Sequence, residues 1–265
     1  EGAAVLNRAD YLAIARKNAR FVLDNLRRDR LLLRTYKDGQ AKLNGYLEDY
    51  SFFIAGLVTL FEVSGELLWL QEALSLAETM IEEFWDDEEG AFFYTGKSHE
   101  QLIVRSKDFF DNATPAGNSV AAEVLLRLGL LTDNSDYRRR AATILRLTAA
   151  SMQRYPSGFG RLLCVLDFYL GSPKEIALIG QPDAAATQVL RKEVWRPFLP
   201  NKVVAQASPN DLEAVKLVPL LRDRPQSEGR PTAYVCEHST CKTPTTSRLE
   251  LASQLGPHTA TAGSG

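Results

Sequence analysis

The sequence has 265 residues, with 31 Lys and Arg against 33 Asp and Glu, so its formal net charge is −2. This near balance argues against a nucleic-acid-binding protein, because such proteins usually carry a basic excess or a basic stripe. Hydrophobic residues make up 45% of the chain and charged residues 24%, which is typical of a globular protein. No run of about 18 apolar residues is present, so no membrane-spanning helix is predicted.

The start of the sequence and its few cysteines indicate a cytoplasmic protein. The first ten residues lack a basic segment followed by an apolar one, so no signal peptide is predicted. Three cysteines are too few for a disulfide scaffold. At this length we expect one large domain, or one domain with a small additional module.

The first two thirds of the sequence predict helices of two alternating kinds. Amphipathic helices, in which apolar residues recur at three and four positions, alternate with helices that are apolar nearly all round. The amphipathic helices are predicted over residues 10–28, 67–85 and 136–152. The apolar helices are predicted over residues 47–63, 115–131 and 157–170. Each amphipathic helix with the apolar helix after it forms a predicted hairpin, in which the apolar member is buried by its neighbours.

Three consecutive hairpins of this kind predict a mainly α fold of the (α/α)6 toroid type. In such a toroid the inner helices touch neighbours on all sides and the outer helices face water. Three hairpins are fewer than a closed toroid needs, so we expect residues 1–171 to form a partial barrel and the sequence to be a fragment of a larger fold.

After Gly171 the pattern changes to short strands and helices. Strands are predicted over residues 174–180, 202–206 and 232–238. Helices are predicted over residues 183–195 and 246–255. We therefore expect residues 172–255 to form a small α/β module and residues 256–265 to form a disordered tail.

Two long connections lead into the first two apolar helices. The first covers residues 31–45, and the second covers residues 86–114, nearly thirty residues. Within the second, the segments GAFFYTG and QLIVR predict a short β-hairpin. A connection of this length in a compact domain is usually functional or disordered, and its aromatic content argues against disorder.

Polar residues gather at the starts of the apolar helices. Glu48, Asp49 and Tyr50 open the first, and Thr114 followed by Pro115 predicts the start of the second. The polar residues around this second start are Lys107, Asp108, Asp111, Asn112, Asn118 and Ser119. If the apolar helices run parallel, these starts meet at one mouth of the toroid, where carboxylates, amides and a lysine converge.

Paired carboxylates at such a mouth point to glycosidic-bond chemistry, in which one acts as an acid and the other as a base or nucleophile. We assign Asp108 or Asp111 as the general acid and Glu48 or Asp49 as its ionised partner. For the latter two, the alternative is that they only complement the helix dipole. Asp167, in an otherwise apolar helix, either points into the cavity or is a paired core acid.

The remaining candidates would bind the substrate. We expect Tyr50 to stack on a sugar ring and Asn118 to hydrogen-bond its hydroxyls, with contributions from four further residues. These four are Lys107, Asn112, Ser119 and Asp167. No histidine lies in an apolar helix, so hydrolysis is favoured over epimerisation by ring histidines. No metal site and no cofactor are indicated.

Cys236 and Cys241 enclose the sequence CEHSTC near the end of the predicted module. With His238 they supply three ligands, whereas a structural zinc site takes four. Their spacing also differs from the CxxC of redox proteins. A zinc site, a reversible disulfide and ordinary reduced thiols therefore all remain open.

Five segments of the sequence occur in the same order in a known family. They are LNGYLEDYSFFIAGLVTLFEVSG, AETMIEEFWDDEEGAFFYT, DNATPAGNSVAAEVLLRL, FLPNKVVA and AYVCEHSTCKTP. On these segments the chain resembles, from about residue 10 to residue 255, the C-terminal part of the thioredoxin-domain-containing proteins of the spermatogenesis-associated protein 20 family.

This resemblance implies an N-terminal thioredoxin-like domain followed by an (α/α)6 barrel similar to N-acylglucosamine 2-epimerases and six-hairpin glycosidases. The thioredoxin-like domain and the first hairpins are not in this sequence. We therefore expect a carbohydrate-active or carbohydrate-binding barrel with a small sugar as its partner, and no nucleic-acid or membrane partner. The alternative is a non-catalytic or redox-linked scaffold, in which Cys236 and Cys241 exchange electrons with the thioredoxin-like domain.

Overall fold

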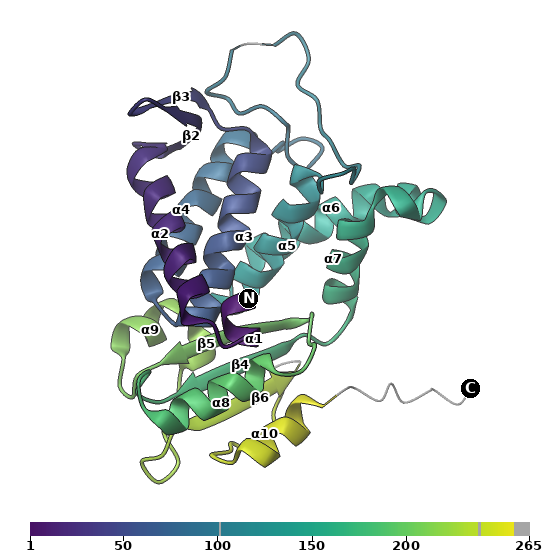
Figure 1. Cartoon of the computed structure of the whole chain (residues 1–265). Helices are drawn as coiled ribbons and strands as arrows, with labels where there is room; N and C mark the ends of the chain where they lie inside the picture. The colour runs from purple at the N-terminus through teal and green to yellow at the C-terminus, as the bar shows by residue number, and fades with distance from the viewer. Residues whose placement is uncertain (101, 238–239, 257–265) are drawn as a thin grey trace, which may run out of the picture.

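The structure, a computed structural model, describes residues 1–100, 102–237 and 240–256. Helices dominate the first two thirds of the chain, and a mixed sheet with further helices follows (Figure 1). The predicted mainly α class is confirmed at this coarse level. The predictions made for residues 257–265, and for His238 at the end of the last strand, lie outside the described residues.

The helices of the first part pair as neighbours along the chain. Their bounds are α1 (Gly2–Val5), α2 (Ala9–Asn25), α3 (Leu47–Ser64), α4 (Leu67–Phe84), α5 (Gly117–Leu131), α6 (Ser135–Arg154), the 3₁₀ turn η1 (Pro156–Gly158) and α7 (Gly160–Leu170). The main contacts join α3 to α4 and α5, and α5 to α6 and α7. α3 and α5 are buried along most of their length, whereas α6 buries one face. The predicted alternation of buried and half-exposed helices therefore holds through α6, but α7, predicted to be buried, buries only Leu162, Val165 and Phe168 and exposes its other face.

Local signals set the ends of these helices. α3 ends where Gly65 adopts φ 75°, a left-handed conformation that costs a glycine little. α6 begins after Asn134, whose side-chain oxygen accepts hydrogen bonds from the backbone N–H groups of Asp136 (2.9 Å) and Tyr137 (3.3 Å).

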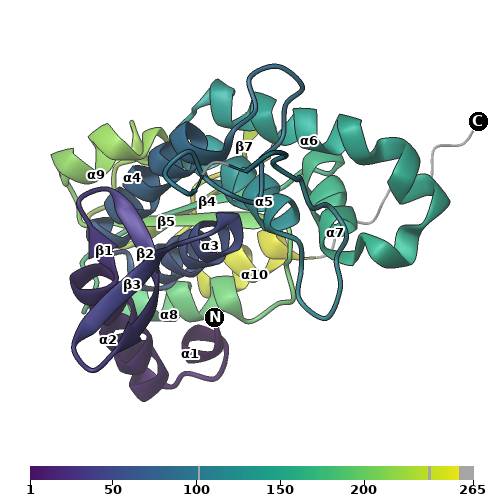
Figure 2. The same cartoon turned by 90° about the horizontal axis from the view of Figure 1, so that it is seen from above.

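The connection over residues 31–45 is a β-hairpin, which the sequence analysis missed. Strands β1 (Arg27–Arg28), β2 (Leu31–Lys37) and β3 (Gln40–Asn44) form an antiparallel sheet in that order. The turn is Asp38-Gly39, with φ 50° and 74°, and an Asp-Gly pair with positive φ is the strongest short hairpin signal. Seen from above, this hairpin and the long loop after α4 lie over the helices (Figure 2).

The hairpin predicted within residues 86–114 is wrong, because no strand occurs among the described residues of that segment. One backbone hydrogen bond joins Tyr94 N–H to the carbonyl of Ser106 (2.8 Å). Instead of a ladder, the side chain of Arg105 donates to the carbonyl of Thr95 (3.1 Å). The loop carbonyl is thus satisfied by a side chain rather than by a second strand.

A four-stranded sheet of order β5-β4-β6-β7 follows α7. The bounds are β4 (Lys174–Ile179), α8 (Ala185–Trp195), β5 (Lys202–Ala207), α9 (Leu212–Leu217), the 3₁₀ turn η2 (Pro219–Leu221), β6 (Thr232–Glu237), β7 (Thr240–Cys241) and α10 (Arg248–Leu255). β4 runs parallel to β5 and antiparallel to β6. In Figure 1 the sheet lies between the helical part and the pair α8 and α10.

Alternation along β4 explains these layers. Ala177 and Ile179 belong to the core shared with the helical part, whereas Ile176 and Leu178 face a second core with α8 and α10. The apolar core therefore continues across the predicted boundary at Gly171.

The junction between α3 and β5 predicts a measurable effect at Gly65. A Cβ added there would lie 2.6 Å from Cγ of Gln206, whose amide donates to the carbonyls of Glu62 and Val63 (3.3 Å each). Gly39 has a similar φ of 74° but open space around its Cα. We expect Gly65→Ala to lower the free energy of unfolding by about 2–3 kcal/mol and Gly39→Ala by about 1 kcal/mol in urea denaturation. Equal losses would contradict a tight junction at Gln206.

Candidate functional site

The starts of the two buried helices α3 and α5 lie side by side. A Cβ added to Gly117 at the start of α5 would lie 2.9 Å from Cγ of Leu47 at the start of α3. Glycine therefore permits the close approach of these two helix ends. The candidate residues of the predicted mouth do come from neighbouring segments.

Asp111 ties the start of α5 to the start of α7. Its Oδ1 accepts a hydrogen bond from Ala116 N–H (2.8 Å), and its Oδ2 accepts from Arg161 N–H (2.7 Å) and Leu162 N–H (3.2 Å). A carboxylate at these positions satisfies unpaired N–H groups and complements both helix dipoles. Asp111 thus caps two helices, which does not fit the role of a general acid.

The other polar residues of the loop before α5 are also engaged. Asp108 is exposed and accepts a hydrogen bond from Phe110 N–H (3.1 Å), and the amide of Asn112 donates to the carbonyl of Phe110 (3.4 Å). Lys107 forms ion pairs with Asp86 (2.5 Å) and Glu89 (3.2 Å). The hydrogen bond from Lys107 lowers the pKa of Asp86. These contacts shape the loop.

Asn118 and Ser119 are fully buried, so neither can hydrogen-bond a sugar as expected. The Oδ1 of Asn118 accepts from Phe92 N–H, and its Nδ2 donates to the carbonyls of Phe92 and Asp108, each at 2.9 Å. The Ser119 hydroxyl has no hydrogen-bond partner among the described residues. Asn118 therefore fixes the loop onto α5 by three hydrogen bonds, which explains an amide in a buried position.

Glu48 and Asp49 share Arg34 at the start of α3. The Arg34 guanidinium lies 3.1 Å from Oε1 of Glu48 and 3.3 Å from Oδ2 of Asp49. Asp49 also accepts from Tyr46 N–H (2.8 Å), and burial raises the pKa of its carboxyl group. Glu48 accepts from the Tyr94 hydroxyl (3.5 Å), whose ring stacks on Tyr46 with centroids 4.9 Å apart. The helix-cap alternative therefore fits Asp49, while Glu48 faces a partly exposed aromatic pair.

Tyr50 and Asp167 differ from their expected roles. Tyr50 is 1% exposed, so its ring cannot stack on a sugar; its hydroxyl accepts from Leu32 N–H (2.8 Å), and burial raises its pKa to about 12. Asp167 is exposed and accepts from the amide of Asn201 (2.7 Å). It is neither a paired core acid nor a residue of the cavity described next, and it joins α7 to the segment before β5.

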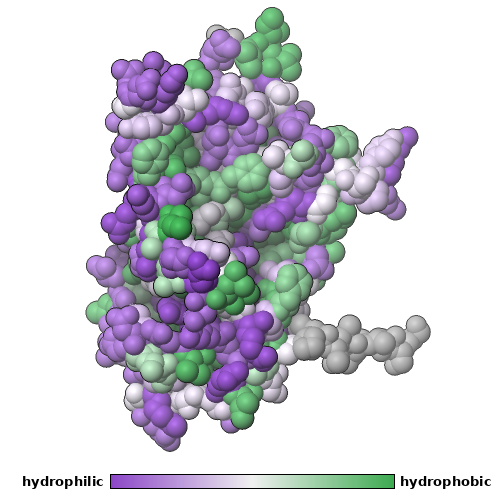
Figure 3. All heavy atoms as spheres, viewed as in Figure 1, coloured by the Kyte–Doolittle hydropathy of each residue, from purple (hydrophilic) through white to green (hydrophobic). Residues whose placement is uncertain are grey.

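A groove of about 910 Å³ is lined by residues of α3, α5 and α7. It extends to α1, α2 and the segment between α8 and β5, and none of the predicted mouth residues lines it. This face mixes hydrophobic and hydrophilic side chains (Figure 3). Its volume is in the range of sites for small molecules.

Four charged side chains connect the three helices inside this groove. Arg127 of α5 forms a close ion pair with Glu62 of α3 and lies 3.9 Å from Glu123 one turn earlier. Arg161 of α7 forms a close ion pair with Glu123. The exposed fraction is 1% for the Glu62 side chain and 11% for that of Arg127. Two carboxylates and two guanidinium groups therefore alternate across the groove.

The Glu62–Arg127 pair is incompletely satisfied. Oε1 of Glu62 and Nε of Arg127 have no hydrogen-bond partner among the described residues. Burial raises the pKa of Glu62, against the opposing effect of Arg127. Burial alone would lower the pKa of Arg127, but Glu62 and Glu123 raise it. Polar atoms left unpaired in a buried position need an explanation, and a ligand is one.

Sequence reasoning missed this cluster, although a signal existed. Glu62 in LFEV and Arg127 in LLRL are single charged residues in stretches that are otherwise apolar. Asp167, the third such residue, was the only one of them predicted to have a role.

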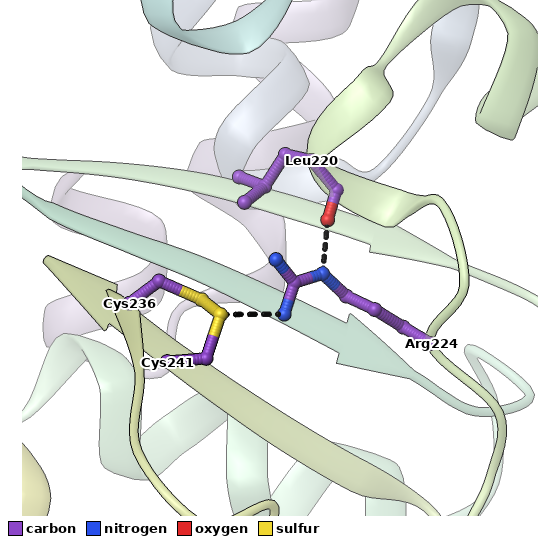
Figure 4. The surroundings of a disulfide bond; sticks show 4 residues. All are labelled: Leu220, Arg224, Cys236 and Cys241. Atoms are coloured by element: carbon purple, nitrogen blue, oxygen red, sulfur yellow. Dashed lines mark hydrogen bonds between the residues drawn. A yellow bond between two sulfur atoms is a disulfide. The ribbon is translucent and has the colours of Figure 1, made fainter. Parts of the chain in front are cut away.

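Cys236 and Cys241 form a disulfide between β6 and β7 (Figure 4). Of the alternatives left open, the structure therefore shows the disulfide. The zinc alternative depends on His238, which lies outside the described residues.

The described residues contain neither a group of metal ligands nor a helix that could span a membrane. No group of three or more His, Cys, Asp and Glu side chains in that part of the chain could hold a metal ion. Within the same residues, every helix is too short or too polar to cross a membrane.

The double cap formed by Asp111 predicts a large effect on stability. We expect Asp111→Ala to lower the free energy of unfolding by about 2–4 kcal/mol, since it leaves the starts of two helices without a cap. Asp108→Ala, with one exposed contact, serves as the matched control and should cost less than about 1 kcal/mol. Urea denaturation of both variants measures the difference. An Asp111→Ala protein as stable as the control would refute the capping role.

The chain was compared with known proteins once this geometry was established. No family model matches it. It is 35% identical over 216 residues to human spermatogenesis-associated protein 20, covering 80% of this chain and 27% of the relative. It is 34% identical over 210 residues to the mouse protein of that name, covering 78% of this chain and 26% of the relative. An uncharacterised protein of Caenorhabditis elegans is 27% identical over 217 residues, which cover 81% of this chain and 29% of the relative.

The chain spans about a quarter of the length of the curated relatives it matches. The matched part nevertheless covers most of this chain, at an identity above 30% for the human and mouse proteins. The chain therefore belongs to the spermatogenesis-associated protein 20 family.

Proposed function

We propose that the chain is part of an (α/α)6-type toroid that binds a carbohydrate in the groove between α3, α5 and α7. The pairs α3–α4 and α5–α6, with α7 beside α5, support this arrangement because they alternate buried and half-exposed helices. The groove is lined by α3, α5 and α7, the helices that we propose as the inner ring on which a toroid binds its ligand.

The observation that carries the proposal is the pair of glutamates bridged by Arg127 in a groove of about 910 Å³. Glycoside hydrolysis needs two carboxyl groups, one protonated and one ionised. Burial raises the pKa of Glu62, which favours its protonated form and suits a general acid. Unlike Tyr50 and Asn118, Glu62 lines the groove, but only 1% of its side chain is exposed, so the proposal requires its carboxyl group to turn toward the substrate when a sugar binds. Glu123 forms a close ion pair with Arg161 and would be the second carboxyl group of the pair.

The groove also offers apolar surface on which a sugar ring can lie. Phe198 lines it with 93% of its surface exposed, whereas Phe168 and Trp195 line it but are buried, with 7% and 4% exposed. Aromatic faces next to charged hydrogen-bonding groups suit an amphipathic ligand with both C–H and O–H surfaces.

Hydrolysis fits this groove better than epimerisation. None of the described residues that line the groove is a histidine, so its acid–base groups are carboxyls. We therefore transfer the proposed chemistry from Asp108 and Asp111 to Glu62 and Glu123. A groove that binds a sugar without hydrolysing it would still satisfy the binding part of this proposal.

A redox-linked scaffold is the second candidate function. The observation that favours it is the Cys236–Cys241 disulfide on the short strand β7. In this alternative the helices present clients to a thioredoxin-like domain of the same protein.

Ligand-observed NMR on the full-length protein tests the first candidate. The panel contains neutral sugars, N-acetylated sugars, uronates and short oligosaccharides. We expect binding by the unchanged protein and a loss of at least roughly tenfold in affinity for Glu123→Gln, because a hydrogen bond to a charged group contributes about 1.5–3 kcal/mol. Glu123→Gln keeps the Glu62–Arg127 pair, so the fold should be retained.

Two further variants complete this test. Glu62→Gln should abolish turnover, with circular dichroism as the check of its fold. Asp108→Asn, outside the groove, is the matched control and should bind and react as the unchanged protein does. Binding that is lost in Asp108→Asn but kept in Glu123→Gln would place the site at the helix starts and contradict the groove.

A further inference from the structure

The two cysteines of the Cys236–Cys241 disulfide differ in their solvent exposure. Cys236 lies on β6 and is 2% exposed, whereas Cys241 on β7 is exposed. The two cysteines are directly opposite partners in the antiparallel β6–β7 pair, where β7 is the edge strand of the sheet. A thiol from solvent can therefore reach the sulfur of Cys241 but not that of Cys236.

A guanidinium group contacts the accessible sulfur. Nη1 of Arg224 donates a hydrogen bond to Sγ of Cys241 at 3.3 Å (Figure 4). Nε of the same residue donates to the carbonyl of Leu220, and its guanidinium carbon lies 5.1 Å from the ring centroid of Tyr234. Arg224 is half-buried and held on two sides, so its charge is fixed beside the sulfur rather than free in solvent.

The charges near the two sulfurs also differ in sign. Glu175 of β4 is the direct cross-strand partner of Cys236, and opposite residues of an antiparallel pair share one face; Glu175 also interacts electrostatically with Arg224. A carboxylate next to Cys236 disfavours its thiolate, while Arg224 favours the thiolate of Cys241. Lys242 is next to Cys241 in sequence, but its ammonium group is engaged elsewhere. It lies 3.5 Å from the carboxylate of Glu237 and donates a hydrogen bond to the carbonyl of Gln254 (2.9 Å).

We propose that Cys236 and Cys241 form a reversible thiol–disulfide couple, in which Cys241 exchanges with an external dithiol or disulfide and Cys236 is the buried resolving thiol. Arg224 is a positioning residue that stabilises the Cys241 thiolate. A hydrogen bond from a cation to a thiolate is stronger than one to a neutral disulfide sulfur, so Arg224 favours the reduced form. This inference does not depend on a ligand in the groove.

The exchange balances in two steps. In reduction, an external thiolate attacks Sγ of Cys241, a mixed disulfide forms, and the Sγ–Sγ bond breaks with Cys236 leaving as a thiolate that takes a proton from water. A second external thiolate then attacks the external sulfur of the mixed disulfide and releases Cys241 as a thiolate. The protein gains two electrons, and the external thiol pair is oxidised to a disulfide. Oxidation follows the same steps in reverse.

Glutathione redox buffers measure the couple. The protein carries Cys164→Ser throughout, because Cys164 is a free, exposed cysteine that would also react. The fraction of disulfide is read by thiol trapping and mass spectrometry across a range of reduced to oxidised glutathione, with circular dichroism to confirm the fold. We expect complete and reversible opening, with a mixed disulfide on Cys241 when Cys236 is replaced by Ser.

Replacing Arg224 separates a redox role from a structural one. Arg224→Gln should shift the half-reduction point roughly tenfold toward more reducing buffer, since it removes the charge beside the thiolate. Arg224→Lys should restore most of the shift because it keeps the charge. Arg222→Gln, an exposed arginine two residues away, is the matched control and should shift nothing.

The outcomes that overturn the proposal are distinct. A disulfide that stays closed in reducing glutathione while the protein is folded would make it a structural crosslink. The reciprocal Cys241→Ser protein tests the assignment: glutathione trapped on its Cys236 as readily as on Cys241 of the Cys236→Ser protein would contradict the assigned roles. A midpoint that Arg224→Gln leaves unchanged would remove the part assigned to Arg224.

Discussion

The ion pair between Glu62 and Arg127 is the constraint around which the helical part is arranged. It lies between the two most buried helices, in a groove that Glu123 and Arg161 also line. Removing two charges from water costs several kcal/mol for each ion, and the pair repays this only when its remaining polar atoms are satisfied. Here Oε1 of Glu62 and Nε of Arg127 are not, among the described residues. The proposed ligand would complete these contacts and so account for charges that stability alone does not require.

The sequence predicted the helices well because burial imposes a period that the residues must follow. The apolar stretch 47–63 predicted a helix that is buried on most sides, and α3 is buried along most of its length. The strands were harder to predict, since Asp38-Gly39 was a hairpin signal that was not used, and the segment after Gly90 had strand-like composition but no partner strand. In the first case the turn residues decided the structure, and in the second the absence of a partner strand did, so composition alone decided neither.

The candidate site shows the same division between what a sequence contains and what it leaves open. The convergence of the helix starts followed from parallel inner helices, but the use of each carboxylate there did not. Asp111 and Asp49 accept backbone N–H groups, a role that depends on loop geometry rather than on residue type. Conversely, Glu62 and Arg127 looked like isolated charges until α3 and α5 were brought together. Which side chains pair between helices that are far apart in sequence depends on the tertiary structure, and the hydrophobic periodicity of the sequence does not determine it.

We propose that the buried Glu62–Arg127 pair serves ligand binding rather than stability, and one double variant tests this most directly. In Glu62→Met/Arg127→Leu both charges are replaced by apolar groups of similar volume, a change that is often neutral or stabilising for a fold. Urea denaturation and sugar binding are then measured on the same protein. The account predicts a free energy of unfolding within about 1 kcal/mol of the unchanged protein, together with loss of binding. A loss of several kcal/mol in stability, or binding that survives both substitutions, would contradict it.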